Sequence, residues 1–252
     1  MCSFRSHGDH DFWAGRTDAS GNLIWSSVYG GSGSEMGYQI QSGNNNTWLV
    51  TGYTGSSDGQ VSGYHGGLTD GWVIRIDENG NLISNAAMGG SGADRLFRTV
   101  EKSNGQLLCF GFAQSSDQEL SGVNATTSNQ FWLTSRDNLF AHQWSYCSGG
   151  SAGDFGNDLL VNDQDGSIVL IGDSNSGNGS VNGNHGGYDF WFLKITPSAS
   201  GIQTAASCGF SFTFDEPSAL LHIHSEKALN GAFVEIQDMS GKVDRKSTRL
   251  NS

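Results

Sequence analysis

Short stretches in which apolar and polar residues alternate recur along the chain and predict β-strands. The segment at 72–77 reads Trp-Val-Ile-Arg-Ile-Asp, so its first, third and fifth residues are apolar, which is the period of two of a half-buried strand. The same alternation recurs at 191–195 and predicts that the tryptophan points inward. Segments 48–50, 107–110 and 168–171 are apolar throughout and predict strands covered on both faces. No segment has convincing helical spacing.

These patterns repeat with a period of about 60 residues, which is the scale of a repeated structural unit. The marker tryptophans are evenly spaced along the chain, and they are Trp13, Trp72, Trp132 and Trp191. Three glycines keep the same register at Gly52, Gly111 and Gly172. A Gly-Gly-Ser sequence recurs at 30–32, 89–91 and 149–151. We interpret these tryptophans and glycines as the structural core of a repeated unit.

Each unit predicts four short strands joined by two hairpin turns. In the unit at 36–88 the turns are Asn44-Asn45-Asn46 and Glu78-Asn79-Gly80, residue types that tolerate positive φ. Hairpins require antiparallel pairing, which disfavours a β-solenoid. The sequence therefore predicts an all-β fold, a β-propeller-like array of four-stranded antiparallel blades.

We place this array at 7–206, with the Gly-Gly-Ser segments as links between blades. The blades are expected at about 36–88, 94–147 and 155–206, with a half blade at 11–29. Propellers contain roughly 4 to 8 blades, so about three and a half blades are an incomplete array. We therefore expect the chain to be a fragment of a longer protein.

Composition narrows the classes of function. The 252 residues include 37 glycines, 36% hydrophobic residues and a net charge of −12, without any block of Lys and Arg, which argues against a nucleic-acid partner. No apolar run is long enough for a membrane-spanning helix. The four cysteines lack metal-ligand spacing.

The polar loops between strands carry the candidate binding residues. The loops at 55–69, 114–128 and 174–187 are expected to form one rim, and they contribute Asp58, His65, Asp117, Asn175 and His185. Oxygen-rich loops of this kind can hold Ca²⁺, but asparagine and aspartate are also ordinary turn formers, and no other cofactor or metal is expected. Histidine occupies nearly the same loop position in three repeats, at His7, His65 and His185, and Asn124 is near that position in the other repeat. Equivalent positions on successive blades lie far apart around a ring, which favours a loop-packing role over a shared metal site.

Two further motifs have simpler explanations. The Gly-x-Ser-x-Gly match at 149–153 lacks the strand-to-helix context of a nucleophile elbow, so we interpret it as a turn and assign no catalytic residue. The marker tryptophans are interpreted as core residues in preference to sugar-stacking platforms. Arg16, Arg75 and Lys194 fall on the opposite strand face and are expected to be solvated or paired with aspartates.

The segments "VSGYHGGLTDGWVIRIDENGNLI", "GGSGADR" and "TWLVTGYTGSSDG" resemble the glycine-rich, propeller-forming repeats of large secreted proteins of the Bacteroidetes type. Residues 208–243, with "LLHI" and "FVEIQDMSGKV", are similar to the first half of the small β-sandwich that serves as the C-terminal sorting domain of the type IX secretion system. Residues 244–252 depart from this pattern and are interpreted as a non-native tail.

This resemblance implies a protein that is secreted or held at the outer cell surface. Its expected partners are the type IX secretion machinery and a glycan or other surface ligand. We expect a binding or structural module without enzymatic activity. The alternative is an extracellular carbohydrate-active enzyme, similar to glycoside hydrolases built on propellers, and the fold alone does not separate the two.

Overall fold

The computed structural model describes residues 7–123, 128–162, 164–198, 201–204, 210–215 and 220–225. The chain divides into two compact units, Met1–Thr204 and Ala205–Ser252. Within the described residues the secondary structure consists of strands and one short 3-10 helix. The prediction of an all-β fold is confirmed.

Among the described residues, the first unit contains fourteen strands and the second unit two. They are β1 (Phe12–Thr17), β2 (Leu23–Tyr29), β3 (Glu35–Ser42), β4 (Trp48–Thr54), β5 (Asp70–Ile76), β6 (Leu82–Met88), β7 (Arg95–Glu101), β8 (Leu107–Ala113), β9 (Gln130–Arg136), β10 (His142–Ser148), β11 (Asp154–Val161), β12 (Ile168–Ser174), β13 (Asp189–Ser198), β14 (Gly201–Thr204), β15 (Phe210–Asp215) and β16 (Leu220–Ser225). The 3-10 helix η1 is Gln118–Leu120.

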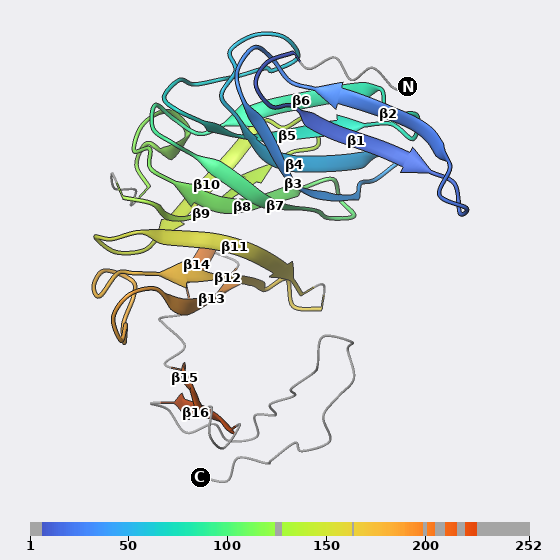
Figure 1. The fold of residues 1–252 in the computed structure, drawn as a ribbon. Coiled ribbons are helices and arrows are strands. Elements are labelled where there is room, and N and C mark those ends of the chain that lie inside the picture. Colours follow the sequence, from blue (N-terminus) through green and yellow to red (C-terminus); the bar gives the residue numbers. More distant parts are fainter. Residues whose placement is uncertain are drawn as a thin grey trace. The chain divides into compact units, whose positions relative to one another are not determined.

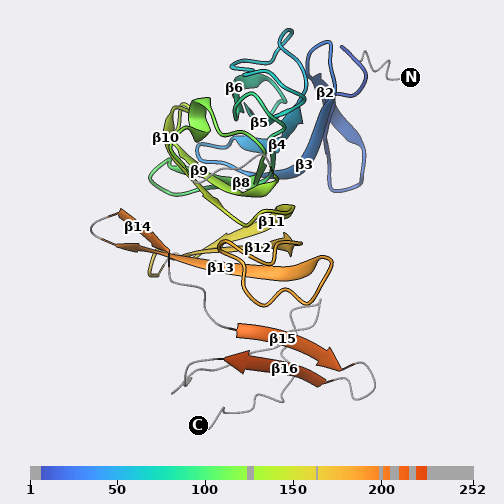
Figure 2. The same ribbon diagram turned by 90° about the vertical axis from the view of Figure 1, so that its left-hand side faces the viewer.

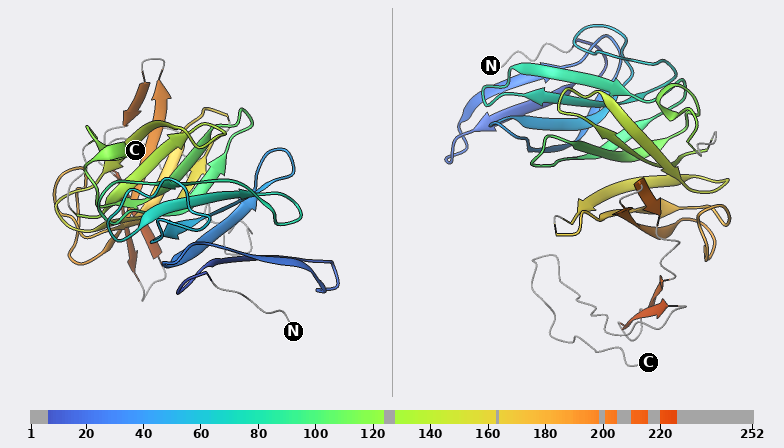
Figure 3. Two further views of the ribbon diagram at one scale, coloured as in Figure 1. Left: turned by 90° about the horizontal axis from the view of Figure 1, so that it is seen from above. Right: turned by 180° about the vertical axis from the view of Figure 1, so that it is seen from behind.

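The first unit is built from one hairpin and three four-stranded sheets (Figure 1). β1 pairs with β2, and the sheets follow in chain order as sheet I (β3–β6), sheet II (β7–β10) and sheet III (β11–β14). Within the hairpin and the three sheets, each strand pairs with the strand that follows it in the sequence, and all of these pairings are antiparallel. Figure 2 shows sheet III as a layer beside sheet II, and Figure 3 shows the β1–β2 hairpin at the other end of the stack. The first strands adjoin one another, since β3 contacts β7 and β7 contacts β11.

Short aspartate turns close the β1–β2 hairpin and the outer hairpins of sheets I and II. One carboxylate oxygen of Asp77 accepts the backbone N–H groups of Asn79 and Asn81, each at 2.8 Å. Asp18 and Asp137 make the equivalent pair of bonds in the neighbouring repeats. An aspartate that satisfies two turn amides favours this tight reversal, so the period of the sequence is also present in the turns.

Glycine is required at 52, 111 and 172 because the backbone of the first strand passes very close to each of these residues. The first strand of sheet I has a register irregularity between Gly37 and Gln39, next to the carbonyl of Met36. A Cβ on Gly52 would lie 1.9 Å from that carbonyl oxygen. Gly111 and Gly172 face the equivalent carbonyls at 2.0 and 1.9 Å, so a side chain at any of the three would force the bulged strand away.

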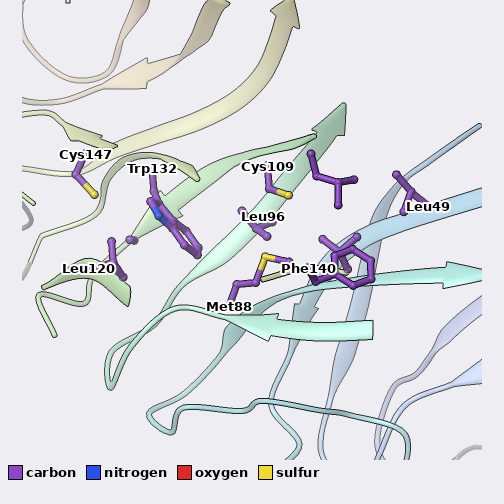
Figure 4. Close-up of a cluster of buried hydrophobic side chains, with 11 residues drawn as sticks. Leu49, Met88, Leu96, Cys109, Leu120, Trp132, Phe140 and Cys147 are labelled. Carbon is purple, nitrogen blue, oxygen red and sulfur yellow. The ribbon is translucent and has the colours of Figure 1, made fainter. Parts of the chain in front are cut away.

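The hydrophobic core lies between consecutive sheets. Trp132 is fully buried between sheets I and II with Leu49, Met88 and Leu96 (Figure 4). A second cluster joins the β1–β2 hairpin to sheet I, and a third joins sheet II to sheet III. Each sheet is therefore stabilised mainly through its neighbours.

The marker tryptophans point toward the preceding sheet, and this decides their burial. Trp72 and Trp132 are 0% exposed, and Trp191 is half-buried with its ring 4.4 Å from that of Phe131. Trp13 is 56% exposed, so the prediction that it points into a core is wrong. The described residues contain no sheet on that side of β1 that would cover it.

The expected half-buried character of the third strand holds in β13, where Leu193 and Ile195 are buried and Lys194 is partly exposed, but it is wrong in sheets I and II. Every residue of β5 and of β9 is buried, on both faces. Arg75 is therefore buried, and its guanidinium makes two hydrogen bonds of 3.0 Å to Glu101. Arg16 and Lys194 are exposed or half-buried, within 4.0 Å of Glu78 and 3.8 Å of Asp165.

The second unit is described only at β15 and β16, which pair antiparallel from Phe210↔Ser225 to Asp215↔Leu220. The rest of the predicted sorting domain at 208–243 lies outside the described residues, as does the tail at 244–252. Their assignments stay predictions.

The contrast between two marker tryptophans gives a test of this packing. We expect Trp72→Ala to lower the free energy of unfolding by about 3 to 5 kcal/mol, as truncation of large core aromatics does. Trp13→Ala is expected to cost less than about 1 kcal/mol, because its ring is already solvated. Urea unfolding followed by circular dichroism measures both. Equal losses would contradict the placement of the two rings.

Candidate functional site

All long loops of the first unit lie at one end of the sheets. In sheet I the start of β3, the end of β4 and the start of β5 are in register, as Glu35 pairs with Thr54 and Thr54 with Asp70. The same pairing in sheets II and III brings together the described segments 30–34, 55–69, 89–94, 114–123, 128–129, 149–153 and 175–188. We call these segments the loop end. The short hairpin turns lie at the opposite end (Figure 1).

Each sheet has a buried carboxylate at the start of its first strand, next to the loop end. Asp94 is 0% exposed and accepts hydrogen bonds from the Gly90 N–H at 2.8 Å, the Gln114 N–H at 2.9 Å and the Ser115 hydroxyl at 2.5 Å. Burial raises the pKa of Asp94, while these donors lower it. One acid thus joins the link segment of its sheet to the long loop that follows the second strand.

The same arrangement recurs in the other sheets. In sheet I, Glu35 accepts from Gly31 N–H at 2.9 Å and from the hydroxyls of Thr54 and Ser56 at 2.8 and 2.6 Å. In sheet III, Asp154 accepts from Gly150 N–H at 2.8 Å and from the hydroxyls of Ser174 and Ser176. The three acids recur with the same period as the marker tryptophans, and this spacing could have revealed them in the sequence.

The predicted loop acids bind the link segments of their own repeat. Asp58 accepts the Ser32 N–H at 2.7 Å, and Asp117 accepts the Ser91 N–H at 2.8 Å. These bonds lower the pKa of both exposed carboxyls. In sheet III the equivalent acceptor is Asn178, with the Ser151 N–H at 2.8 Å. Asn175 instead has an exposed side chain, and its backbone N–H donates to the Gly153 carbonyl.

The predicted histidines contact the aspartates that begin the third strands, β5 and β13. The backbone N–H of His65 donates to Asp70 at 2.5 Å, and its Nδ1 lies 3.2 Å from the same oxygen. His185 and Asp189 form the equivalent pair, with the N–H bond at 2.5 Å and Nδ1 at 3.6 Å. The loop-packing interpretation of the histidines agrees with these contacts.

Asp70 is the most perturbed carboxyl of this region. Its side chain is 0% exposed and its Oδ1 has no hydrogen-bond partner among the described residues. Burial raises the pKa of Asp70 to about 8; the His65 N–H opposes this shift, and the nearby Asp94 and Glu119 add to it. In sheet II, Gln130 replaces this aspartate and donates from its amide to the Gly150 carbonyl at 3.0 Å.

Of the five predicted binding residues, the structure brings together His65 and Asp117. Gln118, which follows Asp117, donates its side-chain amide to the His65 carbonyl at 3.2 Å. Asp58, Asn175 and His185 stay within the loops of their own sheets. Among the described residues, no group of three or more His, Cys, Asp or Glu side chains could hold a metal ion, and Ca²⁺ binding stays a prediction without a donor set.

A row of aromatic side chains runs across the first strands of the three sheets, β3, β7 and β11, near the loop end. The ring of Tyr38 lies 4.6 Å from that of Phe97, and the row continues through Phe112 at 5.9 Å, Phe155 at 5.1 Å and Tyr188 at 5.9 Å. It therefore spans sheets I, II and III. Tyr38 is 41% and Tyr188 59% exposed, while Phe97 and Phe155 are half-buried.

Arg95 supplies a cation within this row. Its guanidinium lies 4.3 Å from the ring centroid of Tyr53 and 5.9 Å from that of Phe112, distances typical of cation–π interactions. Burial raises the pKa of Tyr38, while Arg95 lowers it through its charge and a hydrogen bond. The rings of the row are tilted or edge-to-face toward one another. Exposed aromatic faces beside a cation can bind a flat, hydroxyl-rich ligand.

This row was not predicted from the sequence, because no position in it is aromatic in all three sheets. By strand register, Tyr38 corresponds to Phe97 and then to Asn157, and Arg95 corresponds to Met36 and Phe155. A periodic search finds residues that recur in every sheet, whereas this row uses a different residue in each.

The class defined by these observations is an all-β chain of repeated, four-stranded antiparallel sheets with one common loop end. No family model matches the chain, and no curated protein matches it significantly. Within the described residues, no helix has the length and apolar character needed to cross a membrane.

Replacement of Asp70 tests the buried carboxyl through the pH dependence of stability. The unfolded carboxyl releases its proton near pH 4, whereas the folded one holds it to about pH 8. The folded state thus binds more protons between these values, so the free energy of unfolding falls as pH rises from about 4 to 8. We expect Asp70→Asn to remove this fall and to be more stable at pH 8, by on the order of a few kcal/mol.

Asp58→Asn is the matched control for this measurement. The pKa of Asp58 is lowered, so its linkage lies below pH 4 and the slope between pH 5 and 8 should not change. Thermal unfolding at a series of pH values compares the variants. An unchanged slope in Asp70→Asn would show that Asp70 is ionised in the folded protein.

Proposed function

We propose that this protein is a secreted or surface-held binding module whose aromatic row binds a glycan. The observation that carries the proposal is the row from Tyr38 to Tyr188, which crosses three sheets and includes Arg95. Sugar rings stack on aromatic faces, while their hydroxyls need hydrogen-bonding groups beside them. The loop end supplies such groups in its serine- and asparagine-rich segments.

The arrangement of the sheets supports a propeller-like array as the scaffold. Three sheets follow one another through equivalent link segments, and their first strands adjoin while the outer strands lie farther apart. In a propeller-like array the first strands face the axis, so the aromatic row would line the inner surface near one rim. Loops held by such a rigid scaffold are suited to ligand contacts.

A binding role accounts for the acids better than an enzymatic one. Asp58 and Asp117 use their carboxylates to hold link segments, and their pKa is lowered, whereas a general acid needs a raised pKa. Asp70 and Asp94 have raised pKa values but are inaccessible to solvent. The extracellular carbohydrate-active enzyme therefore gains no support from these groups.

The binding test compares variants at the two exposed ends of the row. On a glycan array followed by titration calorimetry, we expect weak single-site affinity, with Kd about 1 μM or higher. Tyr38→Ala and Tyr188→Ala should each weaken binding by roughly tenfold, as loss of about 1.4 kcal/mol does. Trp48→Ala is the matched control, because Trp48 is a 39% exposed aromatic at the opposite, hairpin-turn end.

Two results would contradict the binding proposal. Equal weakening by all three aromatic variants would indicate a general loss of fold and no role for the row. Hydrolysis of a glycoside that is lost in Asp117→Asn would favour the carbohydrate-active enzyme instead.

We propose the type IX secretion machinery as the export partner, through the unit at 208–243. The proposal rests on the sequence resemblance, and the strand pair β15–β16 is compatible with a small β-sandwich. When this segment is extended by the final strands of the family's domain and fused to a reporter, we expect secretion from a bacterium that has the type IX system. Cell fractionation with reporter assay measures this, and periplasmic retention would contradict the assignment.

A further inference from the structure

The β1–β2 hairpin reproduces the outer half of a four-stranded sheet. Trp13 pairs with Val28 as Trp72 pairs with Ala87. In both strands the register shifts directly after the arginine that follows the tryptophan, between Arg16 and Thr17 and between Arg75 and Ile76. Its turn is closed by Asp18 as the turn of sheet I is closed by Asp77.

The inner half of this sheet is missing from the described residues. In sheet I, β5 pairs along its whole length with β4, from Trp48↔Ile76 to Thr54↔Asp70. The corresponding edge of β1 has no partner strand in the described part of the chain, where β1 and β2 form a two-stranded sheet. A strand edge that no other strand covers favours the addition of a strand.

A groove follows this open edge. It has a volume of about 520 Å³ and lies between β1 and β3, with Phe12 and Ala14 on one side and Met36 and Ile40 on the other. Ile40 is 54% exposed, whereas the residues in the same register of the next sheets, Thr99 and Leu159, are 0% and 6% exposed.

In sheets II and III the position equivalent to Ile40 is covered by the second strand of the preceding sheet. Thr99 accepts a hydrogen bond of 2.8 Å from Thr51, in the second strand of the preceding sheet. Leu159 packs in the cluster of Leu108 and Phe110, again from the second strand of the preceding sheet. Ile40 is exposed because the sheet before it lacks this strand among the described residues.

We propose that the open edge of β1 is a docking site for a two-stranded antiparallel hairpin of the chain's own repeat type. Such a hairpin would pair with β1 through its second strand and cover Met36 and Ile40, as β4 pairs with β5 while β3 and β4 both contact β7. Its second strand must place a glycine opposite Trp13, because glycine faces the tryptophan in all three sheets, as Gly52↔Trp72, Gly111↔Trp132 and Gly172↔Trp191.

The requirement for glycine supplies a sharp control. In sheet I a Cβ at Gly52 would lie 1.9 Å from the Met36 carbonyl oxygen of the paired first strand. A hairpin that carries valine there cannot keep both its own bulged pairing and its register with β1. Pairing at this site is therefore distinguished from non-specific association of any apolar peptide.

The test places a second copy of residues 35–69 directly before Asp11 of the full chain, in place of residues 1–10. The added loop then keeps the length that joins β4 to β5 in sheet I. Hydrogen exchange with mass spectrometry is measured on peptides from 11–17 and 36–42. We expect exchange in both peptides to slow at least tenfold relative to the original chain.

The control fusion carries the Gly52→Val change in the added copy only and should exchange like the original chain. Unchanged exchange in the unmodified fusion would overturn the proposal. Equal slowing in both fusions would overturn the repeat-type pairing in favour of non-specific coverage. Protection of 11–17 in the original chain that rises with protein concentration would overturn it in favour of a second copy of the chain as the occupant.

Discussion

The architecture depends on satisfying one buried carboxylate per sheet. Glu35, Asp94 and Asp154 are each 0 to 1% exposed, and a carboxylate without hydrogen-bond donors at such a site would be strongly destabilising. The donors come from the link before the first strand and from the loop after the second strand. One acid thus holds together two segments that are far apart along the chain, and loss of one donor costs about 1 to 3 kcal/mol.

Packing between sheets follows from complementary volumes at the same register. Gly71 of sheet I makes room for Leu96 of sheet II, since a Cβ on this glycine would lie 2.5 Å from the leucine Cγ. At the preceding interface the large residue is on the earlier sheet instead, where Phe12 lies against Trp72 at 4.6 Å and near Gly37. Close packing of this kind fixes the spacing of the sheets.

The sequence was informative where the recurring residue is of a distinctive type. The glycine opposite each tryptophan is required by a carbonyl of the bulged strand and appears with the period in all three sheets. The buried acids recur with the same period, but their role depends on donors from two distant segments and was not recognised in the sequence. Trp13 was wrongly placed because its burial depends on a neighbouring sheet, which a local pattern does not report. Arg75 was wrongly placed for a related reason, because Glu101, its ion-pair partner, lies in the next sheet.

The two kinds of position separate scaffold from candidate function. Residues that repeat in all sheets, including Asp58 and Asp117 with their counterpart Asn178, are occupied in holding the link segments. The aromatic row occupies positions where the three sheets differ, so the scaffold does not require an aromatic residue there. Two of its members expose large parts of their rings to solvent at a hydrophobic cost that the fold does not impose. A ligand that stacks on these rings would offset that cost, which is why the row, and not the repeated acids, carries the proposed binding function.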